Sequence, residues 1–155
     1  MSDELRSPSK RIYLDVCALC RPFDDQQQVR IHLETSAVAL ILTTVRQTDL
    51  TLIVSSVHQA EIGAIPEFEE HQQLLLLLEQ VDTLFQFDQT PLRQQATQWV
   101  AQGVGLADAA HLAFANAAQA DFVTVDDRLL KQCKRLNLAI WSGTPPAYCE
   151  KENLR

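Results

Sequence analysis

Short apolar segments rich in β-branched and aromatic residues alternate along this chain with longer segments of helical periodicity, and this alternation limits the fold most strongly. Apolar runs of this length and composition are typical of buried strands, and apolar residues spaced three and four apart indicate helices. The predicted strands are 11–16, 51–56, 121–125 and 138–141. The predicted helices are 27–47, 58–65, 68–80, 90–103, 106–120 and 127–136, with 82–88 as a short strand or an extended connector.

Strands that alternate with helices predict a single α/β domain, in which helices flank a central parallel sheet on both faces. A chain of 155 residues is within the usual size of one domain. We expect a flexible N-terminal arm at 1–10, the domain at 11–145 and a C-terminal tail at 146–155. In open sheets of this kind, sites assemble at the edge where the strands have their carboxyl ends.

Four carboxylates fall where that edge is expected. Asp15 and Asp126 each follow an apolar strand, Glu61 lies in the first turns after the second strand, and Asp108 lies in the first turn of the 106–120 helix. Carboxylates that gather in one pocket repel each other and raise each other's pKa. A divalent cation with oxygen ligands, Mg²⁺ or Mn²⁺, relieves this repulsion and can activate water. The pattern therefore predicts an acidic metal site.

Three of these acids also have a purely structural interpretation. Asp126 precedes a helix and could cap it, Asp108 could stabilise a helix dipole, and Glu61 could be a solvated surface residue. Asp15 is different, because no helix is predicted to begin directly after it. Taken together, the four acids indicate a site more strongly than any one of them does.

The segments that carry these acids, in chain order, are Tyr13–Cys17, Ser55–Gly63, Leu106–His111 and Val123–Asp126. They resemble the PIN domain, a family that includes the VapC-like ribonuclease toxins of bacterial toxin–antitoxin pairs. The resemblance runs from Arg11 to about Trp141 and implies a PIN-like fold.

The resemblance also implies an activity. It identifies Asp15, Glu61, Asp108 and Asp126 as the catalytic, metal-binding acids of a Mg²⁺- or Mn²⁺-dependent endoribonuclease, and Thr124 as a hydroxyl residue that supports Asp126. The expected partners are an RNA substrate, a cognate antitoxin protein and a second copy of the chain in a homodimer.

Two features depart from the family. Val16 and Cys17 stand where the family often has asparagine or a hydroxyl residue, and the segment Arg21–Asp25 differs from the small toxins typical of the family. Cys17 and Cys20 have the spacing of a half zinc site, but no second pair completes it. We therefore interpret Cys17 as a small buried thiol.

Several charged residues outside the four acids are candidates for supporting roles. Glu34 lies beside an apolar helical stripe, where a buried charge needs a partner. We expect it to pair with Arg21 or Arg30, or else to join the acids as a fifth member. Arg21 could contact phosphate or bridge a neighbouring aspartate. A basic face on the 127–136 helix, which includes Arg128 and Lys131, is a candidate RNA-binding surface or a solvated helix face.

Composition excludes several other classes. The four glycines do not form a phosphate-binding loop, and a net charge of −7 leaves no broad basic surface for duplex nucleic acid. Cys17 occupies the position of the second acid that a haloacid-dehalogenase phosphatase needs, and a response-regulator receiver needs an acidic pair earlier in the chain.

No signal peptide or membrane span is predicted, so we expect a soluble cytoplasmic protein. The alternative function is a PIN-fold binding or scaffolding module without catalytic activity.

Overall fold

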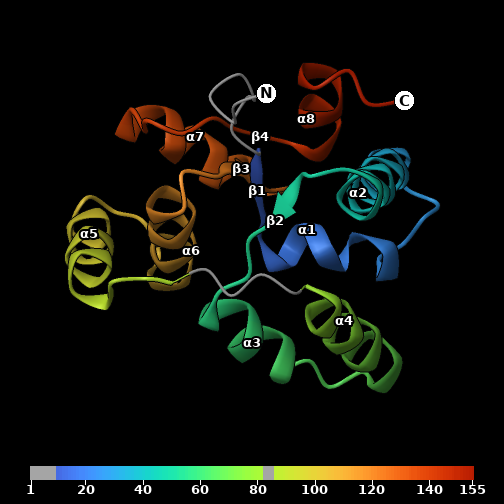
Figure 1. Ribbon diagram of the computed structural model, residues 1–155, viewed down its shortest axis with the longest axis horizontal. Helices are drawn as coiled ribbons and strands as arrows, with labels where there is room; N and C mark the ends of the chain where they lie inside the picture. Colours follow the sequence, from blue (N-terminus) through green and yellow to red (C-terminus); the bar gives the residue numbers. More distant parts are fainter. Residues whose placement is uncertain (1–9, 82–85) are drawn as a thin grey trace, which may run out of the picture.

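The computed structural model describes residues 10–81 and 86–155 and has an α/β fold around a four-stranded parallel sheet (Figure 1). The strands are β1 (Arg11–Leu14), β2 (Thr51–Leu52), β3 (Asp121–Val123) and β4 (Ser142–Gly143), in the order β2-β1-β3-β4. Ile12 pairs with Leu52 on one side and with Asp121 on the other. The predicted α/β domain with a parallel sheet is confirmed.

The helices of the described residues lie between and after these strands. They are α1 (Val16–Cys20), the 3₁₀ helix η2 (Arg21–Phe23), α2 (Val29–Gln47), α3 (Ser56–Gly63), α4 (Phe68–Gln80), α5 (Gln89–Ala101), α6 (Leu106–Ala117), α7 (Asp127–Leu136) and α8 (Pro145–Lys151). Within residues 10–81 and 86–155, none of them combines the length and the apolar character that crossing a membrane requires.

Two apolar cores lie on opposite faces of the sheet, because successive side chains of a strand point to opposite sides. Tyr13 and Phe122 contribute to the core formed with α5, α6 and α7. Ile12, Leu14 and Val123 contribute to the core formed with α1, α2, α4 and α8. In Figure 1 the first group of helices lies to the left of the strands and the second group to the right. The central strands are therefore buried on both faces.

The last strand is not where the apolar pattern predicts it. The segment 138–141 was expected to be a strand, but the paired residues are Ser142 and Gly143. Leu138 and Ile140 instead pack as partly buried side chains against one core, and Trp141 packs against the other. The prediction was wrong because side chains that cover a core from a loop have the same composition as a short strand.

Other differences concern element ends. The sheet pairing of β2 covers fewer residues than the predicted 51–56, and α5 begins at Gln89, capped by Asp88, one residue before the predicted start. Helix α8 was not predicted, although its Tyr148 is fully buried against the sheet core. Residues 1–9 of the expected arm and residues 82–85 of the expected strand or connector lie outside the described residues.

Candidate active site

The four acids line a single cavity of about 420 Å³ beyond the carboxyl ends of the central strands. Asp15 directly follows β1, and Asp126 lies just beyond β3. Glu61 comes from α3, and Asp108 comes from the first turn of α6. Parallel pairing of β1 and β3 is what brings residues so distant in sequence to one edge of the sheet.

Asp15 is the most buried of the four acids, with 4% of its surface exposed. Contrary to the expectation from sequence, it is a helix cap: its Oδ1 accepts a hydrogen bond from the backbone N–H of Ala18 at 3.1 Å. Its own backbone N–H donates to Val123 and so extends the pairing with β3. The cap was missed because α1 has only five residues, too few to show a period.

Charge repulsion connects all four acids. Burial raises the pKa of Asp15 to about 6, and the charge of Asp108 adds to this shift. Burial likewise raises the pKa of Asp108, with further contributions from Asp126 and Glu61. Asp108 thus lies close enough to Asp15, Asp126 and Glu61 for their charges to interact.

Thr124 connects the two acids that follow the strands. It is fully buried, and its Oγ1 accepts a hydrogen bond from the backbone N–H of Asp126 at 3.1 Å. A hydrogen bond from Thr124 also favours the ionised form of Asp15. Asp126 itself caps α7, where its Oδ1 accepts from the N–H groups of Arg128 and Leu129. Asp126 therefore caps α7 and lines the cavity at the same time.

Glu61 is held by a buried polar chain that the sequence did not reveal. Its Oε1 forms a hydrogen bond with Nε2 of His111. On the other side of the ring, Nδ1 of His111 is 2.5 Å from the hydroxyl of Tyr13, which is 2.8 Å from Oγ of Ser55. Burial lowers the pKa of His111 to about 4, so the neutral ring accepts from Tyr13 and donates to Glu61. The signal available in the sequence was only the spacing of His111 one turn after Asp108.

His58 has a structural role beside this chain. Its Nδ1 accepts from the backbone N–H of Ser55 at 3.1 Å and closes a capping box at the start of α3. Its Nε2 donates to the carbonyl of Leu14 at 2.6 Å. These bonds fix α3, and with it Glu61, against the end of β1.

Cys17 is exposed rather than buried, which corrects the interpretation from sequence. It lines the cavity, and its Sγ donates to Oδ1 of Asp15 at 3.0 Å. Partial desolvation of the sulfur at the cavity wall, together with the charge of Asp15, raises the pKa of the thiol, which keeps the donating proton in place. The side chain thus provides a hydrogen bond to Asp15 from the first turn of α1.

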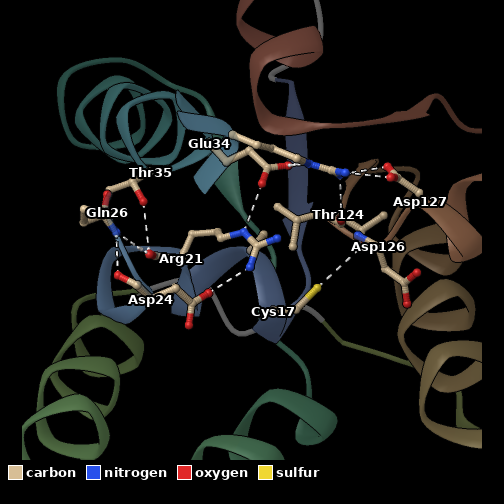
Figure 2. Close-up of polar contacts among 12 residues, drawn as sticks. Cys17, Arg21, Asp24, Gln26, Glu34, Thr35, Thr124, Asp126 and Asp127 are labelled. Carbon is tan, nitrogen blue, oxygen red and sulfur yellow. Dashed lines mark hydrogen bonds and ion pairs between the residues drawn. The ribbon is translucent and has the colours of Figure 1, made fainter. Parts of the chain in front are cut away.

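Glu34 pairs with both arginines and does not line the acidic cavity (Figure 2). Its side chain is 3% exposed and accepts from Nε of Arg21 at 3.0 Å and from Nε of Arg30 at 3.4 Å. Arg30 also forms a bidentate pair with Asp127 and donates to the carbonyl of Val125. Glu34 therefore forms the expected ion pairs and is not a fifth acid of the cavity.

The candidate RNA-binding residues lie on α7, next to the acids. Arg128 lines a second cavity of about 340 Å³, which shares Asp108 and Asp126 with the first. Lys131 is exposed one turn further along the helix. Within the described ranges neither side chain is in an ion pair.

The donor set of the cavity fits a hard divalent cation, because carboxylate oxygens are the ligands that Mg²⁺ and Mn²⁺ prefer. As the side chains stand in residues 10–81 and 86–155, no three acidic, histidine or cysteine side chains surround one point that could hold an ion. Bringing carboxylates onto one ion requires side-chain rotation, and the half-exposed Glu61 and the exposed Asp126 have room for it if they give up their hydrogen bonds to His111 and to the start of α7.

Comparison with known proteins adds no assignment: no protein-family model matches the chain, and neither does any curated protein.

Proposed function

We propose that this protein is a Mg²⁺- or Mn²⁺-dependent endoribonuclease with a PIN-like domain. The observation that carries the proposal is the meeting of Asp15, Glu61, Asp108 and Asp126, from four separate elements, around one cavity at the carboxyl edge of a parallel sheet. Packing alone does not account for this arrangement, because burial raises the pKa of Asp15 and Asp108 and the neighbouring acids raise it further. A cation bound among the acids would offset that cost.

Asp15 and Asp126 would hold the metal directly, with Glu61 and Asp108 completing the site or orienting water. A bound divalent ion would supply a nucleophilic water near neutral pH and neutralise charge on the phosphodiester. Cys17 and Ala18 fix the Asp15 carboxylate by donating to its Oδ1. His111 fixes Glu61 by donating from Nε2 to its Oε1.

We propose single-stranded or looped RNA as the substrate. The resemblance to PIN domains supports this choice, and the net charge of −7 argues against unassisted binding of a stiff duplex. Arg128 and Lys131, on the helix that begins beside Asp126, would contact the RNA backbone. By the same resemblance, a cognate antitoxin would inhibit the enzyme.

The test is cleavage of a pool of structured RNAs by the purified protein. We expect cleavage with Mn²⁺ or Mg²⁺ and none with chelator. Asp126→Asn should lower the rate about a hundredfold or more, since a lost metal ligand costs several kcal/mol of barrier and each ~1.4 kcal/mol is tenfold.

The matched control is Asp127→Asn, which makes the same chemical change one residue along the chain. Asp127 does not line the cavity and pairs with Arg30 on the surface. The Asp127→Asn variant should therefore retain most of the activity. Cleavage that survives both chelator and Asp126→Asn would contradict the proposal, as would equal losses in the two variants.

A further inference from the structure

Arg21 is the one lysine or arginine among the described residues that line the acidic cavity. It begins η2, directly after α1, in the segment 21–25 that sets this chain apart from the PIN family pattern. Of the described residues at this cavity, Arg21 is therefore the single positively charged side chain beside four acids, and its hydrogen bonds determine how it is oriented there.

Both the side chain and the backbone of Arg21 are fixed by neighbouring residues. Nε donates to Glu34 at 3.0 Å, and Nη1 donates to Asp24 at 2.9 Å. The Arg21 carbonyl accepts from Oγ1 of Thr35 at 3.0 Å and from Nε2 of Gln26 at 2.9 Å. Figure 2 shows these contacts surrounding the arginine on the side away from the strand ends.

This fixation leaves one edge of the guanidinium unused. Nη2 has no hydrogen-bond partner among the described residues, and in Figure 2 it lies on the side of the guanidinium that faces Cys17 and Thr124. A guanidinium carries five N–H donors, so after two bonds to carboxylates it retains donors for a ligand. The side chain is 20% exposed, so that edge is accessible from the cavity.

The charges around Arg21 also favour an anion at this edge. Glu34 is nearly inaccessible to solvent and receives a second hydrogen bond from Arg30. Arg21 is therefore not the sole partner of this buried charge. Because Glu34 and Asp24 already hold the guanidinium in one orientation, little side-chain freedom remains to be lost when it binds a ligand.

We propose that Arg21 binds a non-bridging phosphate oxygen of the substrate through Nη2, with Glu34 as a positioning residue for the guanidinium. This inference rests on the proposed ribonuclease function. The guanidinium of Arg21 would attract the phosphodiester into the acidic cavity and hold it near the acids. Guanidinium groups are well suited to this because their N–H donors match phosphate oxygens in geometry and charge.

The experiment measures rate against concentration of the RNA pool, in Mn²⁺, for the wild type and three variants. Arg21→Gln combined with Glu34→Gln removes the donor without leaving a buried unpaired charge, and should lower kcat/KM about 10- to 100-fold, mainly through KM. Arg21→Lys keeps a charge but loses the fixed edge, and should lie between the double variant and the wild type. Arg93→Gln removes one positive charge from an exposed site on α5, away from the cavity, and should match the wild type.

Mn²⁺ binding by calorimetry and thermal melting separate this role from a purely structural one. The double variant should bind Mn²⁺ as the wild type does, because Arg21 touches none of the four acids. An active wild type with an equally active double variant would overturn the role of Arg21 and leave the proposed function standing. A loss of activity that followed Mn²⁺ affinity would also overturn it. A wild type without chelator-sensitive cleavage would overturn the proposed function and this inference together.

Discussion

Asp15 serves two roles that conflict when no cation is bound. Its carboxylate caps α1 while lying almost out of reach of solvent. Burial raises its pKa from the usual ~3.9 to about 6. Above pH 6 the folded chain therefore holds an ionised carboxylate in surroundings that stabilise the charge less well than water does.

Asp15→Asn should consequently increase the free energy of unfolding in the presence of chelator. Asparagine caps a helix about as well as aspartate and carries no charge. The shift of about two pKa units sets an upper bound of ~3 kcal/mol on the gain at neutral pH. The folded state binds the proton more tightly, so the gain should be absent near pH ~4, grow as pH rises toward 6 and stay constant above.

Urea unfolding of both proteins across this pH range measures the effect. The readout is the difference between the two proteins, because His58 and His111 act on both. Burial lowers the pKa of each histidine to about 4, so both proteins lose stability as pH falls from ~6.5 toward 4. A gain that was independent of pH would show that the Asp15 charge does not oppose folding.

The meeting of the four acids at one edge of the sheet could be predicted from sequence, because Asp15 and Asp126 follow apolar strands and the other two lie in helices that begin at that edge. Their immediate partners could not. The bond from Cys17 to Asp15 depends on the turn into α1, and the chain from Tyr13 to Glu61 joins three elements. A single sequence carries no periodic signal for contacts of this kind.

At the level of elements, β4 is shaped by one close contact. A Cβ built on Gly143 would lie 2.4 Å from Cη2 of Trp141, nearer than packed atoms approach. The indole ring in turn packs edge-on against Tyr148 of α8, with ring centroids 5.8 Å apart. The glycine therefore allows the ring to lie between the strand and the last helix.

Gly143→Ala should lower the free energy of unfolding by about 1–3 kcal/mol, because the ring must move or the backbone shift. Gly63→Ala is the matched control: Gly63 is exposed in the last turn of α3, and an added Cβ would meet nothing within 4 Å. Alanine should be neutral or stabilising there by up to ~1 kcal/mol. Denaturant midpoints of both variants test the contrast, and equal effects would contradict it.

Long periodic helices and the inner strands followed from the sequence, and the short terminal elements did not. Helix α4 has the predicted bounds, 68–80, because its pattern extends over several turns. Strand β4 has two residues and one of them is glycine, so nothing in its composition indicates pairing. Helix α8 begins with two prolines, and its seven residues are held by tertiary packing of Tyr148 and Cys149.

On the scale of the whole molecule, the leucine run 74–78 is covered better than its composition suggests. Leu74 is buried, and Leu75, Leu77 and Leu78 are partly buried against the α2 side of the sheet. Leu76 and, at the start of the same helix, Phe68 remain 54% and 75% exposed. We propose that a second copy of the chain contacts α4 at these two side chains.

Leu76→Glu should therefore shift the protein from dimer to monomer in light scattering at tens of micromolar. Gln94→Glu adds the same charge at an exposed position of α5 and should leave the dimer intact. A wild type that is monomeric under these conditions would contradict the homodimer, and a dimer that survives Leu76→Glu would place the interface elsewhere.

The order of the strands also has a consequence for when the site comes into existence. The first strand lies between β2 and β3, so one of its two hydrogen-bonded edges stays open until the segment beginning at Asp121 has been made. Chains are synthesised from the N-terminus, and such long-range pairing is slow to form. On the ribosome, Asp15 and Glu61 emerge long before Asp126, and they meet it only when β3 docks. A nascent chain would thus carry no complete set of acids until β3 and Asp126 had left the ribosome.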